Sequence, residues 1–132
     1  MIPGGDSPVL DVSFDGFGFV DNITENAGFV FIPPDPIGAV GTDRVIAVVN
    51  TMIESRDKAG VLLARDALMD FFSPVSPTTP TFDPKVIFDQ YESRFVVVTL
   101  EVVNSGINPN PGNISRILLA VSKTATPHTR SH

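Results

Sequence analysis

The chain alternates short apolar runs with clusters of proline, glycine and polar residues. Three of the runs are rich in Val, Ile and Leu, which is typical of buried strands, and these are Arg44–Asn50, Arg94–Val103 and Ile114–Ser122. Shorter or more alternating runs predict further strands, and these are Gly28–Ile32, Thr51–Asp57, Val61–Leu68 and Lys85–Phe88. The pattern predicts an all-β chain of about eight strands.

No segment predicts a long helix. Residues 61–68 contain good helix formers, but the segment is short and follows the turn "KAG", so we expect a strand there. A turn or short helix is expected next, in "LMDFF". The core is expected to include the phenylalanines of "FDGFGFVDN" and the central strand residues, namely Phe14, Phe17, Phe19, Val45, Ile46, Val48, Val86, Ile87, Phe95, Val97, Leu118 and Ala120.

Composition fits a small folded domain. A chain of 132 residues can bury one modest core, and the 42% hydrophobic content with 10 Phe indicates that it does so. Pro (12) and Gly (10) are frequent, which predicts many turns. The net charge is −6 and the 9 Lys and Arg residues are scattered. Because nucleic-acid binding needs clustered basic residues, we expect no such partner.

Several kinds of chemistry and location are excluded by what the sequence lacks. There is no Cys, so disulfides and thiolate sites are absent. No apolar run approaches the roughly 20 residues of a membrane helix, so no membrane insertion is expected. The first residues, "MIPGGDSPVLD", lack the features of a signal peptide. The end, Arg130–His132, is typical of a polyhistidine-tag remnant, which leaves only His128 and argues against a histidine-based site.

Three stretches share a pattern: "PPDPIGAVGTDRVIAVVN" followed by "DKAGVLL", then "FDPKVIFDQYESRFVVVTLE", and finally "ILLAVSKTATP". Together, over residues 29–127, they resemble the blades of secreted bacterial β-propeller proteins, in particular sialidase-like and other glycosidase-type propellers. The resemblance implies antiparallel, four-stranded, blade-like sheets in a partial β-propeller that is secreted or at the cell surface. Two groups of strands, repeating at about 40 residues, agree with the spacing of blades.

The same pattern divides a single all-β domain into a lead-in (1–28), a first blade-like unit (29–72) and a second one (73–127). Two incomplete units cannot close a ring of about four to eight blades. The chain is therefore a fragment, or several copies assemble, or the strands form a β-sandwich or small barrel instead. Exposed strand edges invite pairing, so we expect a homo-oligomer or edge-to-edge strand pairing.

The hairpin "FDQYES" carries the first candidate site residues. An Asp at the first position of a turn bonds to the backbone of the turn, so Asp89 is expected to order it, with Asp89 or Glu92 facing Arg94. Tyr91, at the tip, is a candidate for stacking on a sugar. Tyr91, Glu92 and Arg94 are thus the candidate ligand-binding residues.

Calcium is the candidate cation, because it takes carboxylate and carbonyl oxygens from loops. Its candidate ligands, at junctions of loops and strands, are Asp35, Asp43, Asp83 and Asp89. No motif for nucleophilic catalysis is present. The sequence therefore predicts a binding or structural interaction module of an extracellular propeller, with a carbohydrate or protein ligand. The alternative is a cation-dependent, glycosidase- or lactonase-like hydrolase that uses loop carboxylates.

Overall fold

The computed structural model describes residues 9–104, 106 and 111–126. His128 and the suspected tag remnant Arg130–His132 lie outside the described residues. The elements, in chain order, are α1 (Phe19–Glu25), β1 (Ile37–Val40), β2 (Arg44–Val49), β3 (Met52–Asp57), β4 (Leu62–Ala67), α2 (Leu68–Phe71), a 3-10 turn (Ser73–Val75), β5 (Phe82–Asp89), β6 (Arg94–Val103) and β7 (Ile114–Val121).

The strands form two antiparallel meanders. Sheet A has the order β1-β2-β3-β4, and sheet B has the order β5-β6-β7. The turn between β3 and β4 is tight: Gly60 has a φ of 89°, and Asp57 Oδ1 accepts bonds from the N–H groups of Ala59 and Val61. The all-β prediction is confirmed. Within the described residues, sheet A has four strands and sheet B has three, as expected for an incomplete second unit, and neither sheet closes into a barrel.

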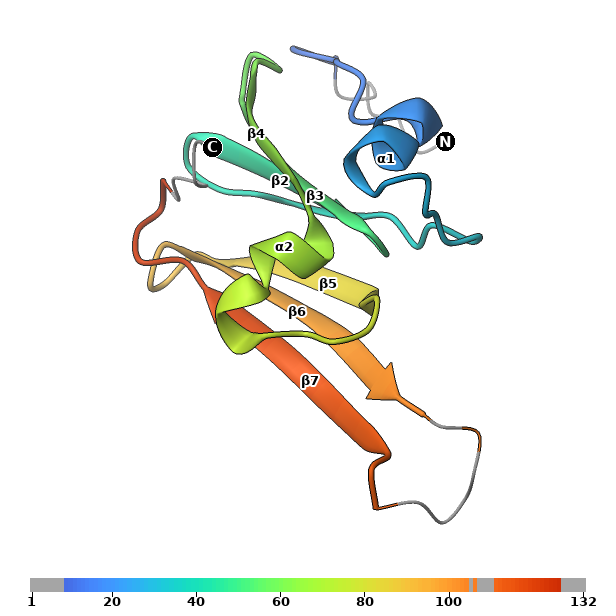
Figure 1. The fold of residues 1–132 in the computed structure, drawn as a ribbon. Helices are drawn as coiled ribbons and strands as arrows, with labels where there is room; N and C mark the ends of the chain where they lie inside the picture. The colour runs from blue at the N-terminus through green and yellow to red at the C-terminus, as the bar shows by residue number, and fades with distance from the viewer. Residues whose placement is uncertain (1–8, 105, 107–110, 127–132) are drawn as a thin grey trace, which may run out of the picture.

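The two sheets pack face to face, and α1 lies on the far side of sheet A (Figure 1). Successive side chains of a strand point to opposite faces of the sheet. A continuous run of β-branched residues therefore makes both faces apolar, and one of these faces can pack on the other sheet. The inner face of sheet A consists of Ile37, Ala39, Ile46, Val48 and Ile53. It contacts the packed face of sheet B, which consists of Val86, Phe88, Phe95, Val97, Leu118 and Ala120. Leu68 and Phe72, in and next to α2, complete this core.

The opposite face of sheet B, which we call the open face, is also apolar. Three rows of neighbouring side chains cross it: Ile87, Val96 and Val121 in one row, Lys85, Val98 and Leu119 in the next, and Leu100 with Ile117 in the third.

The turn between β1 and β2 approaches sheet B closely at Gly41. A Cβ atom on this buried glycine would lie 2.6 Å from Cζ of Phe95 and 3.0 Å from Cε2 of Phe88. The two rings pack together with their centroids 4.8 Å apart. Phe95 is only 2% exposed, so its ring has little room to move. Glycine at position 41 therefore lets the first hairpin of sheet A reach the aromatic pair of sheet B.

The first hairpins of the two sheets repeat each other in register. Each begins with Asp-Pro, and in each the Asp has a left-handed φ, 50° at Asp35 and 49° at Asp83. The pair Ala39 and Ile46 in sheet A is equivalent to the pair Ile87 and Val96 in sheet B. The third strands continue the repeat, because Val48 pairs with Ile53 as Val98 pairs with Leu119. The side chains differ, but the strand pairing and the left-handed φ of the Asp are the same in both sheets.

This repeat has a direction. Ala39 and Ile46 belong to the inner face of sheet A, whereas their equivalents Ile87 and Val96 belong to the open face of sheet B. The packed face of sheet B corresponds instead to the outer face of sheet A. The two sheets are therefore stacked head to tail, and the face with which sheet A contacts sheet B corresponds to the face that sheet B leaves exposed.

Several sequence-based expectations are wrong. Gly28–Ile32 forms no strand, and the first strand is β1, after the prolines. Phe19, expected in the core, begins α1 and is 57% exposed, and Phe14 is 38% exposed. Ile87 is 58% exposed because it lies on the open face. The burial of the other central residues is confirmed, with Val45 and Ala120 only partly buried.

We expect Gly41→Ala to lower the free energy of unfolding by about 1–3 kcal/mol, because the new methyl group would overlap the Phe95 ring. Gly38→Ala is the matched control. Its Cβ would lie 3.4 Å from the carbonyl oxygen of Ile46, a tight but tolerable contact at an exposed position. Chemical denaturation of both variants tests the expectation, and equal stabilities would contradict the close approach at Gly41.

Candidate functional site

The turn between β5 and β6 has the geometry expected for Asp89. Its Oδ1 accepts hydrogen bonds from the N–H groups of Tyr91 at 2.9 Å and Glu92 at 3.2 Å. The expected pairing of Arg94 with these carboxylates is wrong, because Arg94 Nη1 donates to the carbonyl oxygens of Ser122 and Lys123. Arg94 therefore ties the hairpin to the segment after β7. Tyr91 is 88% exposed at the tip, and its role in ligand binding stays a prediction.

Two of the four candidate calcium ligands meet where the sheets begin. Asn50 Nδ2 donates to Asp35 Oδ2 at 2.9 Å, and Asn50 Oδ1 accepts from the N–H of Asp83 at 2.7 Å. Asn50 is 5% exposed and also donates to the carbonyl oxygen of Pro33. A cleft of about 440 Å³ lies beside these groups, lined among others by Phe31 and Phe82. Asn50 thus fixes the two left-handed Asp-Pro corners against each other.

The other two candidates lie at the opposite ends of the same strands. Asp43 is in the turn after β1, where its carboxylate is 3.8 Å from Arg44 Nε, and Asp89 ends β5. A strand rises about 3.3 Å per residue, so Asp83 and Asp89 are separated by roughly 20 Å. The four side chains cannot share one ion. No group of three acidic or histidine side chains with metal-binding geometry occurs in residues 9–104, 106 and 111–126, and calcium binding by either pair stays a prediction.

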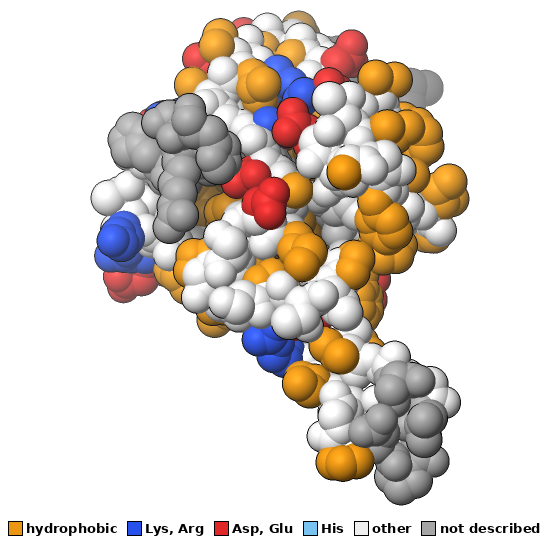
Figure 2. All heavy atoms as spheres, viewed as in Figure 1, with side chains coloured by type: hydrophobic (Ala, Val, Ile, Leu, Met, Phe, Trp, Pro, Cys, Tyr) orange, Lys and Arg blue, Asp and Glu red, His pale blue; other side chains and the backbone are white. Residues whose placement is uncertain are grey.

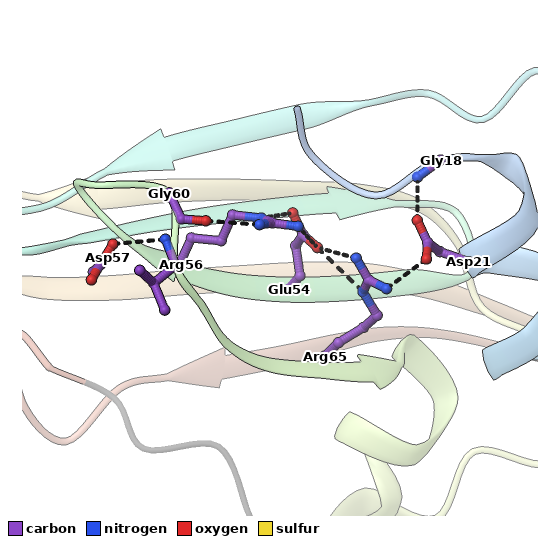
Figure 3. A network of polar contacts seen from close by, with 8 residues as sticks. Gly18, Asp21, Glu54, Arg56, Asp57, Gly60 and Arg65 are labelled. Carbon is purple, nitrogen blue, oxygen red and sulfur yellow. Dashed lines mark hydrogen bonds and ion pairs between the residues drawn. The ribbon is translucent and has the colours of Figure 1, made fainter. Parts of the chain in front are cut away.

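Sequence reasoning missed a buried polar network on the outer face of sheet A (Figure 3). Glu54, on β3, is 2% exposed and accepts bonds from Arg56 Nε at 2.7 Å and Arg65 Nη2 at 3.0 Å. Arg65 reaches on to Asp21 of α1 at 2.8 Å. The N–H of Gly18 donates to Asp21, and this bond together with Arg65 lowers the pKa of that carboxyl group. The network attaches α1 to sheet A.

Further contacts fasten the N-terminal segment to the same face. The Arg56 guanidinium lies 5.9 Å from the centroid of the Phe14 ring. Thr51 Oγ1 and Asn22 Oδ1, both on buried residues, are 2.5 Å apart. Figure 2 shows hydrophobic side chains at the surface on the side of the molecule where α1 lies. The exposed large apolar residues of the N-terminal segment include Phe19, Val20, Ile23, Phe29 and Ile32. The N-terminal segment therefore covers sheet A mainly through polar contacts and leaves apolar side chains at the surface.

A second buried carboxylate, also missed, joins the long loop after α2 to sheet B. Glu101, on β6, is 1% exposed. Its Oε1 accepts from the N–H groups of Thr78 at 2.5 Å and Thr79 at 2.9 Å, and its Oε2 accepts from Arg116 Nε at 2.6 Å. Burial raises the pKa of this carboxyl group, but these hydrogen bonds outweigh it and lower the pKa to about 2. Glu101 thus orders the Pro/Ser/Thr loop.

The open face of sheet B is a regular apolar surface that none of these contacts explains. Ile117 is 74% exposed, Leu119 60% and Val121 53%, and they adjoin Ile87 through the β6 residues between them. Monomeric proteins seldom expose a contiguous apolar patch of this kind unless something binds there. None of the described helices is long or apolar enough to cross a membrane. The open face is therefore the candidate interaction surface.

We expect Asp89→Ala to lower the free energy of unfolding by about 1 kcal/mol, because two backbone N–H groups of the turn lose their acceptor. Gln90→Ala, at an exposed position of the same turn, is the control and should have little effect. Thermal melting with and without calcium completes the test. A calcium-dependent rise in the parent melting temperature that Asp89→Ala abolishes would assign Asp89 to a metal site instead.

The depressed pKa of Glu101 predicts a pH-dependent contribution to stability. The contribution is fully present above the ordinary pKa of 4.5 and is lost as the pH falls through about 2. A shift of this size is worth at most about 3 kcal/mol. Glu101→Gln should therefore lower the stability at neutral pH and flatten the loss of stability between these two pH values. Denaturation curves against pH test this, with the exposed Glu92→Gln as control; parallel curves for the parent and Glu101→Gln would refute it.

Comparison with known proteins adds no relative to this description. No family model, no curated protein and no solved structure matches the chain. The function is therefore argued from the geometry of the molecule itself, with the open face of sheet B as its principal feature.

Proposed function

We propose that the protein is a structural interaction module that binds a further antiparallel β-sheet on the open face of sheet B. The observation that carries the proposal is the register repeat between the sheets. In sheet A, Ala39 and Ile46 contact the next sheet. Ile87 and Val96 occupy the equivalent positions in sheet B. By this equivalence, the open face is built to contact a sheet in the same way.

The composition of β6 and β7 supports the same proposal. In a strand with one face in water, polar residues alternate with apolar ones. In β6, by contrast, Val96, Val98 and Leu100 point to the open face while Phe95 and Val97 are buried on the packed face. Both faces of the strand are therefore apolar. Each large side chain removed from water there would stabilise a complex by roughly 1.5–3 kcal/mol before the costs of association.

The repeat also specifies the chemistry of the partner. The surface that fits against an inner face in this fold is a packed face such as that of sheet B, with Val86, Phe88, Phe95 and Val97. We therefore infer that the partner presents an apolar, aromatic-containing face of an antiparallel sheet. In the β-propellers that the sequence resembles, this partner is the next blade, and the secreted setting expected from that resemblance is part of the proposal. No observation on the described residues favours the hydrolase alternative.

A peptide probe tests the proposal. Residues 82–103, the β5–β6 hairpin, carry the packed-face residues, and cyclisation through cysteines added at both ends should keep the hairpin folded. Added to the isotopically labelled protein, this peptide should shift the amide signals of Val96, Val98 and their neighbours on the open face. Ile87→Glu should weaken binding about tenfold or more, because it places a charge in the apolar contact.

Val40→Glu is the matched control. Val40 is similarly exposed, at 61%, but it lies on the outer face of sheet A. It should leave the affinity for the peptide unchanged. Equal affinities for the parent and Ile87→Glu, or shifts confined to other surfaces, would contradict the proposal.

A further inference from the structure

We propose that β7 is a dimerisation edge, at which two copies of this chain join their B sheets through antiparallel pairing of β7 with β7. The inference goes beyond the proposed function, because it concerns the backbone edge of sheet B and not its open face. Among the residues that the structure describes, sheet B has the order β5-β6-β7, so β7 has a strand on one side only. Its other side presents the hydrogen-bonding groups of an eight-residue strand.

The hydrogen bonds of the ladder show which residues carry these free groups. The N–H of Ser122 donates to the carbonyl oxygen of Phe95 at 2.9 Å. In an antiparallel ladder, residues that exchange such bonds alternate with residues whose N–H and C=O point the other way. Counting back from Ser122, the outward-pointing residues of β7 are Ser115, Ile117, Leu119 and Val121. The same residues carry the side chains of the open face.

In sheet A, the edge that corresponds to the free edge of β7 is paired with another strand. By the register repeat, β3 is the equivalent of β7, and Thr51, just before β3, corresponds to Ile117. The carbonyl oxygen of Thr51 accepts a bond from the N–H of Leu68 at 2.9 Å, and β4 covers the edge of β3 in antiparallel orientation. The equivalent edge of sheet B therefore has the geometry to accept an antiparallel strand.

β7 also lacks the devices that normally protect an edge strand. Such strands are usually short, bulged, or carry proline or outward-facing lysine. β7 pairs with β6 over all of Ile114–Val121 without a register shift, and it contains no proline or lysine. Its one charged side chain, Arg116, turns to Glu101 and to the carbonyl oxygens of Val75 and Ser76. No charge is left to repel an approaching strand.

A second copy of the same strand fits this edge by symmetry. Two identical antiparallel strands are related by a two-fold axis, so each contact is made twice. With the axis at Leu118, Ile117 pairs with the partner's Leu119, and Ser115 pairs with the partner's Val121. This register uses every outward-pointing residue of β7. It also sets Arg116 beside the partner's Ala120, so no like charges face each other.

Sedimentation velocity over a range of concentrations tests the dimer in the intact chain. Leu119→Pro removes an N–H that points away from β6, so the ladder within the sheet keeps its bonds. Because the two-fold axis doubles the loss, this variant should weaken the dimer roughly 100-fold. Leu119→Val keeps the N–H and an apolar side chain and should remain dimeric. Ile87→Glu, which disrupts the open face but not the edge, should remain dimeric as well.

Hydrogen exchange of the parent keeps the test independent of how well Leu119→Pro folds. The amides of Ile117, Leu119 and Val121 should become protected as the concentration rises. A parent that stays monomeric, or a dimer in which these amides exchange freely, would overturn the inference. So would a dimer that survives Leu119→Pro but is lost in Ile87→Glu, because that dimer would use the open face. Failure of the hairpin peptide to bind would affect only the proposed function.

Discussion

The contact between the inner face of sheet A and the packed face of sheet B is the interaction on which the rest of the structure depends. Each sheet is a meander whose apolar side chains are buried by the other sheet as its second layer. Gly41 allows the close approach, since any side chain there would meet Phe95. The contact is then fixed by polar groups outside the core. Asn50 holds the two Asp-Pro corners, and Glu101 holds the loop that leads into sheet B.

The outer faces of the two sheets differ in composition and in what covers them. On sheet A, Glu54, Arg56 and Arg65 replace apolar side chains, and they bind an N-terminal segment that supplies the complementary groups. On sheet B, the equivalent layer is missing from the described residues, although the side chains there are apolar. The outer face of sheet A carries an ion-pair network that binds α1, whereas the outer face of sheet B is apolar and has no cover among the described residues. This difference supports the proposal that a further sheet packs on sheet B.

The sequence predicts the positions of the strands better than it predicts which of their faces are covered and by which segments. The run Arg94–Val103 reads as a strand in any context, because β-branched residues dominate it, and the turn function of Asp89 is local enough to be recognised. Ile87 was misassigned because apolar character does not tell which face of a sheet is covered. Helix α1 was missed because "FVDNITE" has no clear helical period and depends on Arg65, 44 residues away, for its attachment. Glu54 and Glu101 were missed for a similar reason, since Arg65 reaches Glu54 from another strand and Thr78 reaches Glu101 from a distant loop.

The head-to-tail direction of the repeat implies different partners for the open face of sheet B and for its β7 edge. In a head-to-tail stack, the inner face of one sheet fits the packed face of the next and not a copy of itself, so the contact is heterologous. In a second copy of this chain, the packed face is already used by its own sheet A, and α1 occupies part of the outer face of sheet A. Among the described residues of another copy, no free sheet face therefore corresponds to the packed face that would fit the open face. The β7 edge, by contrast, is its own complement, because an antiparallel strand pairs with an identical strand. The partner that we propose for the open face is thus a different sheet, whereas the partner that we propose for the edge is a second copy of the same protein.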